Sequence, residues 1–186
     1  MKNCPLRVFV TMTRDELENQ LMHTKNNYIL GLAAYSLYES GRVNTQLQTH
    51  VTAFGDYFIT FKQVTDLLDH PRDRKIVLSE FLKMHMRTLI KESFEHIRDY
   101  CEKTRQYQTL KQEPWYQFAR MIRNFLSHNC RFEFNKYDKL ELPVKWRDLE
   151  ITIKMNKCTL DMDFFSYVET WELFLEFEDF VLNRLE

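Results

Sequence analysis

Residues 114–128 read PWYQFARMIRNFLSH, and the spacing of their apolar side chains predicts an amphipathic helix. Pro114 suits the first turn of this helix, because proline lacks the amide hydrogen that the first turn leaves unbonded. At about 100° per residue, the apolar side chains gather on one side of the helical wheel. They are Trp115, Phe118, Ala119, Ile122, Phe125 and Leu126. Such a side must pack against other elements, so the stretch predicts one helix of a larger helical core.

The opposite side of this helix is polar and lies within an arc of roughly 140°. It holds Gln117, Arg120, Arg123, Asn124, Ser127 and His128. Arg123 and His128 stand at opposite edges of the arc, about 7.5 Å apart along the helix axis. We expect this side to be solvated and to accept a small anionic group between its two edges.

The composition of the chain favours long helices. Only three Gly and four Pro occur in 186 residues, whereas sheet-rich folds need many turns and therefore many of these residues. Hydrophobic residues make up 44% and charged residues 28%, which is typical of a globular protein and not of a disordered one. The formal net charge of −1 argues against a protein that coats nucleic acid, but it permits a small site with local positive charge.

Four further helices are expected. Thr13 and Glu16 have the spacing of a capping box, which indicates where the first helix begins, and the Ser-Gly pair at 40–41 indicates where it ends. Pro71 separates the second helix from the third, because the residue before a proline disfavours helical geometry. The four helices are expected over about 14–40, 45–69, 73–107 and 161–185.

The expected helix over 73–107 has one charged side and one apolar side. The charged side, interpreted as a solvated stripe, holds Glu80, Lys83, Arg87, Lys91, Glu95, Arg98 and Glu102. The core side holds Leu78, Leu82, Met86, Leu89, Ile97 and Cys101. The last helix is apolar over most of its circumference, so we expect it to bury more than one side, either in the bundle or against a second subunit.

Between the last two helices, residues 131–154 change their period. Phe132 and Phe134 alternate with charges, and Leu149, Ile151 and Ile153 alternate with polar residues, which predicts a small β-hairpin or two short strands. The sequence therefore predicts one mainly all-α domain over 1–186. Its architecture is an up-down bundle of about five helices with a β-hairpin insert before the last helix.

The spacing of the cysteines and the hydropathy of the chain indicate a soluble protein of the reducing cytosol. The cysteines are dispersed and form no Cys-x-x-Cys pair, which argues against a disulfide framework and fits a reducing cytosol. The N-terminus has no extended apolar run of the kind found in signal peptides. No stretch approaches the roughly 18 uncharged apolar residues of a membrane span. We therefore expect a soluble, cytoplasmic protein without membrane association.

The segment from Arg123 to His128 resembles the Arg-x4–6-His motif of the HEPN superfamily, whose ribonuclease members often carry a polar residue directly after the arginine. Here four residues separate the two, and Asn124 stands in the second place. The context is similar too, because the motif ends the penultimate helix and one more long helix follows it. Beyond the motif the resemblance is architectural, and the insert over 131–154 departs from the minimal bundle.

This resemblance implies an RNA endonuclease that needs no metal or other cofactor, acting as a toxin or defence effector. His128 would exchange protons with the RNA, Arg123 would hold the phosphate, and Asn124 would orient either group. The cut would use the 2′-hydroxyl and leave 2′,3′-cyclic phosphate and 5′-hydroxyl ends. The implied partners are RNA, a second copy whose motif faces the first, and a neutralising antitoxin or another defence protein.

Further RNA contacts are expected from Arg120, Ser127, Arg131 and Lys136, which lie near the motif in the sequence. An alternative from another class stays open, because HEPN-like domains also serve as non-catalytic dimerisation or adaptor modules in defence or regulatory complexes.

A metal site is the other alternative. Glu92, His96 and Asp99 fall on one helical face at steps of four and three residues. Di-metal sites in bundles, however, use Glu-x-x-His pairs on two helices together with further carboxylates, and no such pair of motifs occurs here. We therefore expect no metal.

Overall fold

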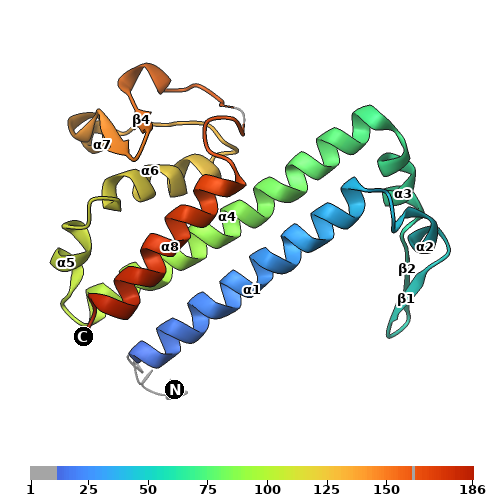
Figure 1. Cartoon of the computed structure of the whole chain (residues 1–186), viewed down its shortest axis with the longest axis horizontal. Coiled ribbons are helices and arrows are strands. Elements are labelled where there is room, and N and C mark those ends of the chain that lie inside the picture. The colour runs from blue at the N-terminus through green and yellow to red at the C-terminus, as the bar shows by residue number, and fades with distance from the viewer. Residues whose placement is uncertain (1–11, 161) are drawn as a thin grey trace, which may run out of the picture.

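The computed structural model of the chain describes residues 12–160 and 162–186 (Figure 1). Its elements, in chain order, are α1 (Arg14–Glu39), α2 (Asn44–Gln48), β1 (Val51–Phe54), β2 (Tyr57–Thr60), α3 (Lys62–Asp69), α4 (Pro71–Lys103), α5 (Tyr107–Lys111), α6 (Tyr116–Ser127), α7 (Lys136–Glu141), β3 (Val144–Trp146), β4 (Leu149–Ile151), the 3-10 turn η1 (Ile153–Met155) and α8 (Tyr167–Asn183). The predicted mainly helical class with a small β-hairpin before the last helix is confirmed.

Helix α4 is the centre of the arrangement, and it contacts α1, α3, α5, α6 and α8. Helices α1 and α4 form a long antiparallel pair, and α8 lies beside both at one end of this pair (Figure 1). The core between α4, α6 and α8 is aromatic. The ring of Phe94 lies 5.8 Å from that of Tyr116 and 6.1 Å from that of Phe177, and Trp115 lies 4.9 Å from Phe177.

The first helix has the predicted start and end. The hydroxyl of Thr13 accepts a hydrogen bond from the amide of Glu16, and the carboxylate of Glu16 accepts one from the amide of Thr13. These two bonds satisfy amides that the first turn leaves exposed. After the last residue of α1, Gly41 adopts a φ of +69°, a conformation that glycine takes without steric cost.

The prediction of one helix over 45–69 is wrong. The structure has the short α2, the antiparallel β1–β2 hairpin and then α3 in this region. Gly55 turns the chain with a φ of +59°, and the stretches on either side of Gly55-Asp56 are rich in β-branched and aromatic residues. These local preferences outweigh the apolar spacing. The predicted end of the region is confirmed, because α3 stops at Asp69 and α4 begins at Pro71.

The β1–β2 hairpin projects from one end of the bundle, far from α6 (Figure 1). Its aromatic side chains are exposed, with 61% of Phe54, 78% of Tyr57 and 73% of Phe58 open to solvent. Such a concentration of uncovered aromatic surface is uncommon on a monomer.

Helix α4 is shorter than predicted and begins earlier. It ends at Lys103, and Arg105 adopts a φ of +64°, which a continuing helix does not allow. The predicted core side is buried throughout. The prediction that the whole charged stripe is solvated is wrong, because Arg87 and Glu95 are half-buried against α6.

In the insert, the β3–β4 hairpin confirms the predicted strands, but Phe132 and Phe134 belong to a different arrangement. Segment 130–134 runs beside segment 156–160. The amide of Phe132 donates to the carbonyl of Cys158 (3.1 Å), and the amide of Lys157 donates to the carbonyl of Phe132 (2.7 Å). In the chain, helix α7 follows segment 130–134 and precedes β3, and the alternating pattern did not indicate it.

Helix α8 begins at Tyr167 and not at 161, because Ser166 caps it in a box with Glu169. The helix contacts α4 and α1, which agrees with burial on more than one side. It also leaves Val168, Leu175 and Leu182 exposed. Within the described residues, no helix combines the length and the apolar composition needed to cross a membrane.

Gly31 sets the distance between α1 and α4. A Cβ atom placed on Gly31 would lie 2.5 Å from Nδ1 of His85 on α4, whose ring packs edge-on at 4.5 Å from that of Phe81. Burial lowers the pKa of His85, which favours the neutral ring in this contact. The helices therefore approach closely because α1 has no side chain at this position.

Replacing Gly31 with Ala is expected to lower the free energy of unfolding by roughly 1–3 kcal/mol, the usual cost of overpacking. In a His85→Ala background the ring is absent, so Gly31→Ala should stabilise by up to about 1 kcal/mol through helix propensity. Denaturant unfolding of the four proteins measures both effects. Equal effects of Gly31→Ala in the two backgrounds would refute the contact.

Candidate active site at the end of helix α6

The apolar side of α6 anchors it as predicted. All six predicted residues, Trp115 to Leu126, are buried. The ring of Phe118 stacks 5.1 Å from that of Trp146 on β3, and the ring of Phe125 lies 4.5 Å from that of Phe132. Helix α6 is therefore held between the bundle and the insert, and its last turn has a fixed place.

The polar side of α6 is not solvated along its whole length, and Arg120 is the first exception. Its Nη1 lies 2.5 Å from Oδ1 of Asp138, a carboxylate only 1% exposed, and its Nε donates to Gln117 (3.0 Å). A buried carboxylate needs such a partner, since an unpaired charge is costly inside a protein. Arg120 therefore joins α6 to α7, and its guanidinium is engaged within the fold.

Arg123 also turns inward, towards α4. Its Nη1 lies 3.3 Å from Oε1 of Glu95, and its guanidinium carbon lies 5.7 Å from the centre of the Phe94 ring. Glu95 also binds Arg98, with 2.5 Å between Oε2 and Nη2. The Nε of Arg123 is buried without a hydrogen-bond partner in the described part of the chain. One carboxylate and one aromatic face thus fix the direction of this guanidinium.

His128 caps the C-terminal end of α6. Its amide donates to the carbonyls of Asn124 (3.0 Å) and Phe125 (3.2 Å), so its backbone is held by the last turn. Its side chain is 53% exposed, and Nδ1 lies 3.9 Å from Oε2 of Glu133. The imidazole is therefore open to solvent on one side and faces a carboxylate on the other.

Arg87 of α4 supports the same turn. Its Nε donates to the carbonyl of Leu126 (2.7 Å), and its Nη2 donates to Oδ1 of Asn129 (3.2 Å). Asn129 and Cys130 then adopt φ values of 55° and 57°, which direct the chain away from the helix axis. A cation at a helix C-terminus offsets the unpaired carbonyls there. This contact keeps the backbone around His128 in place.

The remaining predicted residues occupy three different surroundings. The hydroxyl of Ser127 donates to the carbonyl of Arg123 (2.8 Å), and Asn124 lines a small space with Glu133. The Nε of Arg131 lies 3.9 Å from Oε1 of Glu133. The exposed Lys136 lies over the Tyr137 ring, 4.8 Å from its centre, at the start of α7.

The structure therefore brings Asn124, His128 and Arg131 around Glu133, whereas Arg123 faces α4. In residues 12–160 and 162–186, no ion pair or hydrogen bond joins the side chains of Arg123 and His128. Each of the two residues has a carboxylate neighbour of its own.

Sequence reasoning did not indicate Arg87, Glu95 and Glu133 as neighbours of the site. Arg87 and Glu95 belong to the charged side of α4. The spacing of charged residues is the same whether that side faces only solvent or also packs against the polar side of another helix. Glu133 lies beyond the helix end, where no helical period applies. No signal in one sequence marks these three contacts.

The alternative metal face has other partners. Glu92 lies 3.8 Å from Lys91, and Asp99 lies 3.8 Å from Arg98 and 4.0 Å from Lys103. Within the described ranges, no three His, Cys, Asp or Glu side chains are grouped as a metal site requires.

Comparison of the chain with protein-family models, with curated proteins and with solved structures gave no match. No relative therefore assigns a role to the motif or to the insert.

Arg123 and Glu95 are expected to be coupled energetically. Arg123→Ala should lower the free energy of unfolding by about 1–2 kcal/mol, since it removes a half-buried ion pair and a cation–π contact. Glu95→Gln should also destabilise, and the double variant should lose less than the sum, because both changes remove one contact. His128→Ala serves as the exposed control, with a loss below about 0.5 kcal/mol. Strict additivity in denaturant unfolding would show that the pair is not coupled.

Proposed function

We propose that this protein is a metal-independent RNA endonuclease of HEPN type. The observation that carries the proposal is the exposed imidazole of His128, held by its backbone at the end of α6, five residues after an arginine. An exposed titratable group on a rigid support is what general acid–base catalysis needs.

The reaction is a displacement at phosphorus. The 2′-oxygen of the RNA loses its proton to a base and attacks the adjacent phosphorus, while the bond from phosphorus to the 5′-oxygen breaks and that oxygen takes up a proton. The products are a 2′,3′-cyclic phosphate and a 5′-hydroxyl. His128 can perform either proton transfer, because imidazole exchanges protons near neutral pH.

Two carboxylates prepare the two residues for these roles. Glu133 lies 3.9 Å from Nδ1 of His128, beyond hydrogen-bond distance, so its contribution in this proposal is a negative charge beside the imidazole. Glu95 holds Nη1 of Arg123, and no hydrogen bond from the other guanidinium nitrogens is formed in the described residues. Because Nε is buried, Nη2 is the guanidinium nitrogen that is left to donate to a phosphate.

A second copy of the chain completes the site in this proposal. Arg123 and His128 have different neighbours within one chain, so one copy offers a phosphate only part of the contacts that cleavage requires. Two copies related by a two-fold axis, with their α6 polar sides facing, place the motif of each opposite that of the other.

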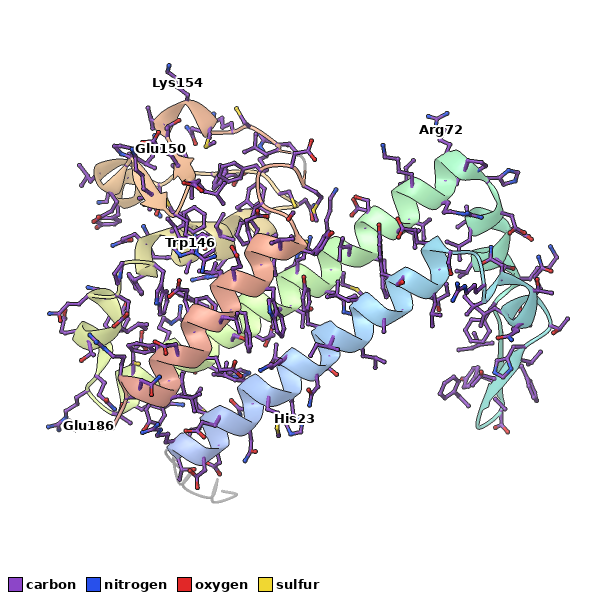
Figure 2. All side chains as sticks on the ribbon, in the orientation of Figure 1. His23, Arg72, Trp146, Glu150, Lys154 and Glu186 are labelled. Atoms are coloured by element: carbon purple, nitrogen blue, oxygen red, sulfur yellow. The ribbon has the colours of Figure 1, made fainter. Side chains whose placement is uncertain are left out.

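His128→Ala is expected to lower the cleavage rate of single-stranded RNA by at least about a hundredfold, the usual contribution of a general acid or base. The matched control is His23→Ala, which removes an exposed histidine of α1 (Figure 2) and should leave the rate unchanged. Cleavage should continue in excess EDTA, and a 2′-deoxy nucleotide on the 5′ side of the cut should block it. Products with 5′-phosphate ends, detected by mass spectrometry, would reject this chemistry.

If the site is shared between two copies, an inactive subunit is expected to inhibit RNA cleavage by the wild-type subunit. An excess of His128→Ala protein, allowed to exchange subunits with the wild type, should lower the wild-type rate because mixed dimers hold an incomplete site. RNA is kept in large molar excess, so that competition for RNA does not affect the rate. An unchanged rate, together with a monomeric mass by light scattering, would contradict the shared site.

One observation favours a second function, that of a non-catalytic interaction module. The exposed aromatic side chains of the β1–β2 hairpin form an apolar surface far from α6, of a kind that often marks a protein contact. If wild type and His128→Ala both leave RNA intact, this second function is the one that the structure supports.

A further inference from the structure

The insert forms a cleft of about 410 Å³ close to His128. Its cations are Arg131, Lys139 and Lys157, all three exposed, and the amides of Asn135 and Asn156 lie on its walls. Glu133 is the one acidic residue among the described residues that line it. The two lysines and the two amides have no part in the proton transfers at His128.

The cleft has a hydrogen-bonded frame. The amide of Phe134 donates to Oδ1 of Asn156 (3.1 Å), which joins the two backbone segments that form one wall. The side chain of Asn135 caps α7, and Asp138 of α7 is bound to Arg120 of α6. These contacts hold the backbone of the insert in place, so the three cationic side chains extend from a rigid backbone.

The charge of the insert differs in sign from that of the whole chain. Residues 131–160 hold seven Lys and Arg against five Asp and Glu, whereas the complete chain has a net charge of −1. One of these five carboxylates, that of Asp138, is buried and paired with Arg120. The cleft is therefore a local positive region that attracts a polyanion.

The cleft is next to the catalytic group of the proposed function. Glu133 lies on its wall, and the oxygens of this carboxylate are 3.9 Å from Nδ1 of His128 and 3.9 Å from Nε of Arg131. The cleft and the imidazole of His128 therefore share Glu133 as a neighbour, so a strand bound in the cleft lies close to His128.

We propose that this cleft binds the phosphate backbone of single-stranded RNA beside the cleaved bond, an inference that rests on the proposed function. Arg131, Lys139 and Lys157 contact the phosphates, and the two asparagine amides supply hydrogen bonds to sugars or bases. A positively charged groove that follows the backbone is the usual way to bind a single strand without sequence preference. The insert thus provides substrate binding, while α6 provides the proton transfers.

The test uses Lys139→Ala combined with Lys157→Ala, placed in His128→Ala protein so that the RNA is not cut. Binding of a fluorescein-labelled single-stranded RNA is measured by anisotropy at several salt concentrations. We expect the affinity to fall about tenfold at low salt and the slope of log affinity against log salt to decrease by roughly 1.4, the value for two lost phosphate contacts.

The matched control is Lys145→Ala combined with Lys154→Ala, which removes the same charge from the insert outside the cleft. Lys154 points outward from the tip of the insert (Figure 2), and Lys145 pairs with Glu150 at 3.3 Å. This control should bind within about twofold of the parent, as expected for cations that contact no phosphate. An equal loss in the control and in the cleft variant would overturn the proposal.

The outcomes separate this proposal from the proposed function. If wild type cleaves RNA but the cleft variant binds and cleaves as well as its parent, the cleft assignment fails and the function stands. If the wild type cleaves no RNA, and the cleft variant loses RNA binding while the control keeps it, the assignment of the cleft as an RNA-binding site is supported and the nuclease function fails. Absence of any RNA binding by the His128→Ala protein would overturn the proposal that the cleft binds RNA.

Discussion

Phe94 lies in the middle of α4 and contacts both helices that pack on this part of it. Its ring meets Tyr116 of α6 and Phe177 of α8, and the guanidinium of Arg123 lies over the same ring. Because α6 and α8 are placed by this aromatic core, the end of α6 and the insert that follows it are placed as well. The next residue, Glu95, then holds Arg123. Core packing and site geometry therefore depend on two consecutive residues of one helix.

Much of the fold follows from local patterns. The capping box at Thr13, the proline at 71 and the apolar sides of α4 and α6 each involve residues a few positions apart, so one sequence contains the whole signal. The region 45–69 was predicted wrongly because apolar spacing and strand propensity disagree there, and the turn at Gly55 decides between them. Helix α7 is short. Asn135 and Asp138 form a local capping box at its start, but the same carboxylate is also buried against Arg120 of α6, a contact that no local pattern contains.

The site could be predicted only in part, for a related reason. A helical wheel correctly separates the buried and polar sides of α6, but it does not show which element covers each polar residue. Arg123 is paired with a residue of α4 and Arg120 with a residue of α7, so both are engaged by partners distant in the sequence. His128 is the residue whose environment the wheel describes best, because it lies at the helix end with its side chain exposed.

The length of α4 has a consequence for how the molecule opens. Its 33 residues span about 50 Å, but its first buried side chain is Leu78, and most of its buried residues lie between Met86 and Cys101. The first two turns and the adjoining hairpin extend beyond α6 and α8 (Figure 1). Helix α3 packs against that end, but few buried side chains of α4 anchor it, so we expect its amide hydrogens to exchange with solvent through local opening. The amide hydrogens near Phe94 are expected to exchange only when the whole core opens, so this one continuous helix should contain both weakly and strongly protected amides.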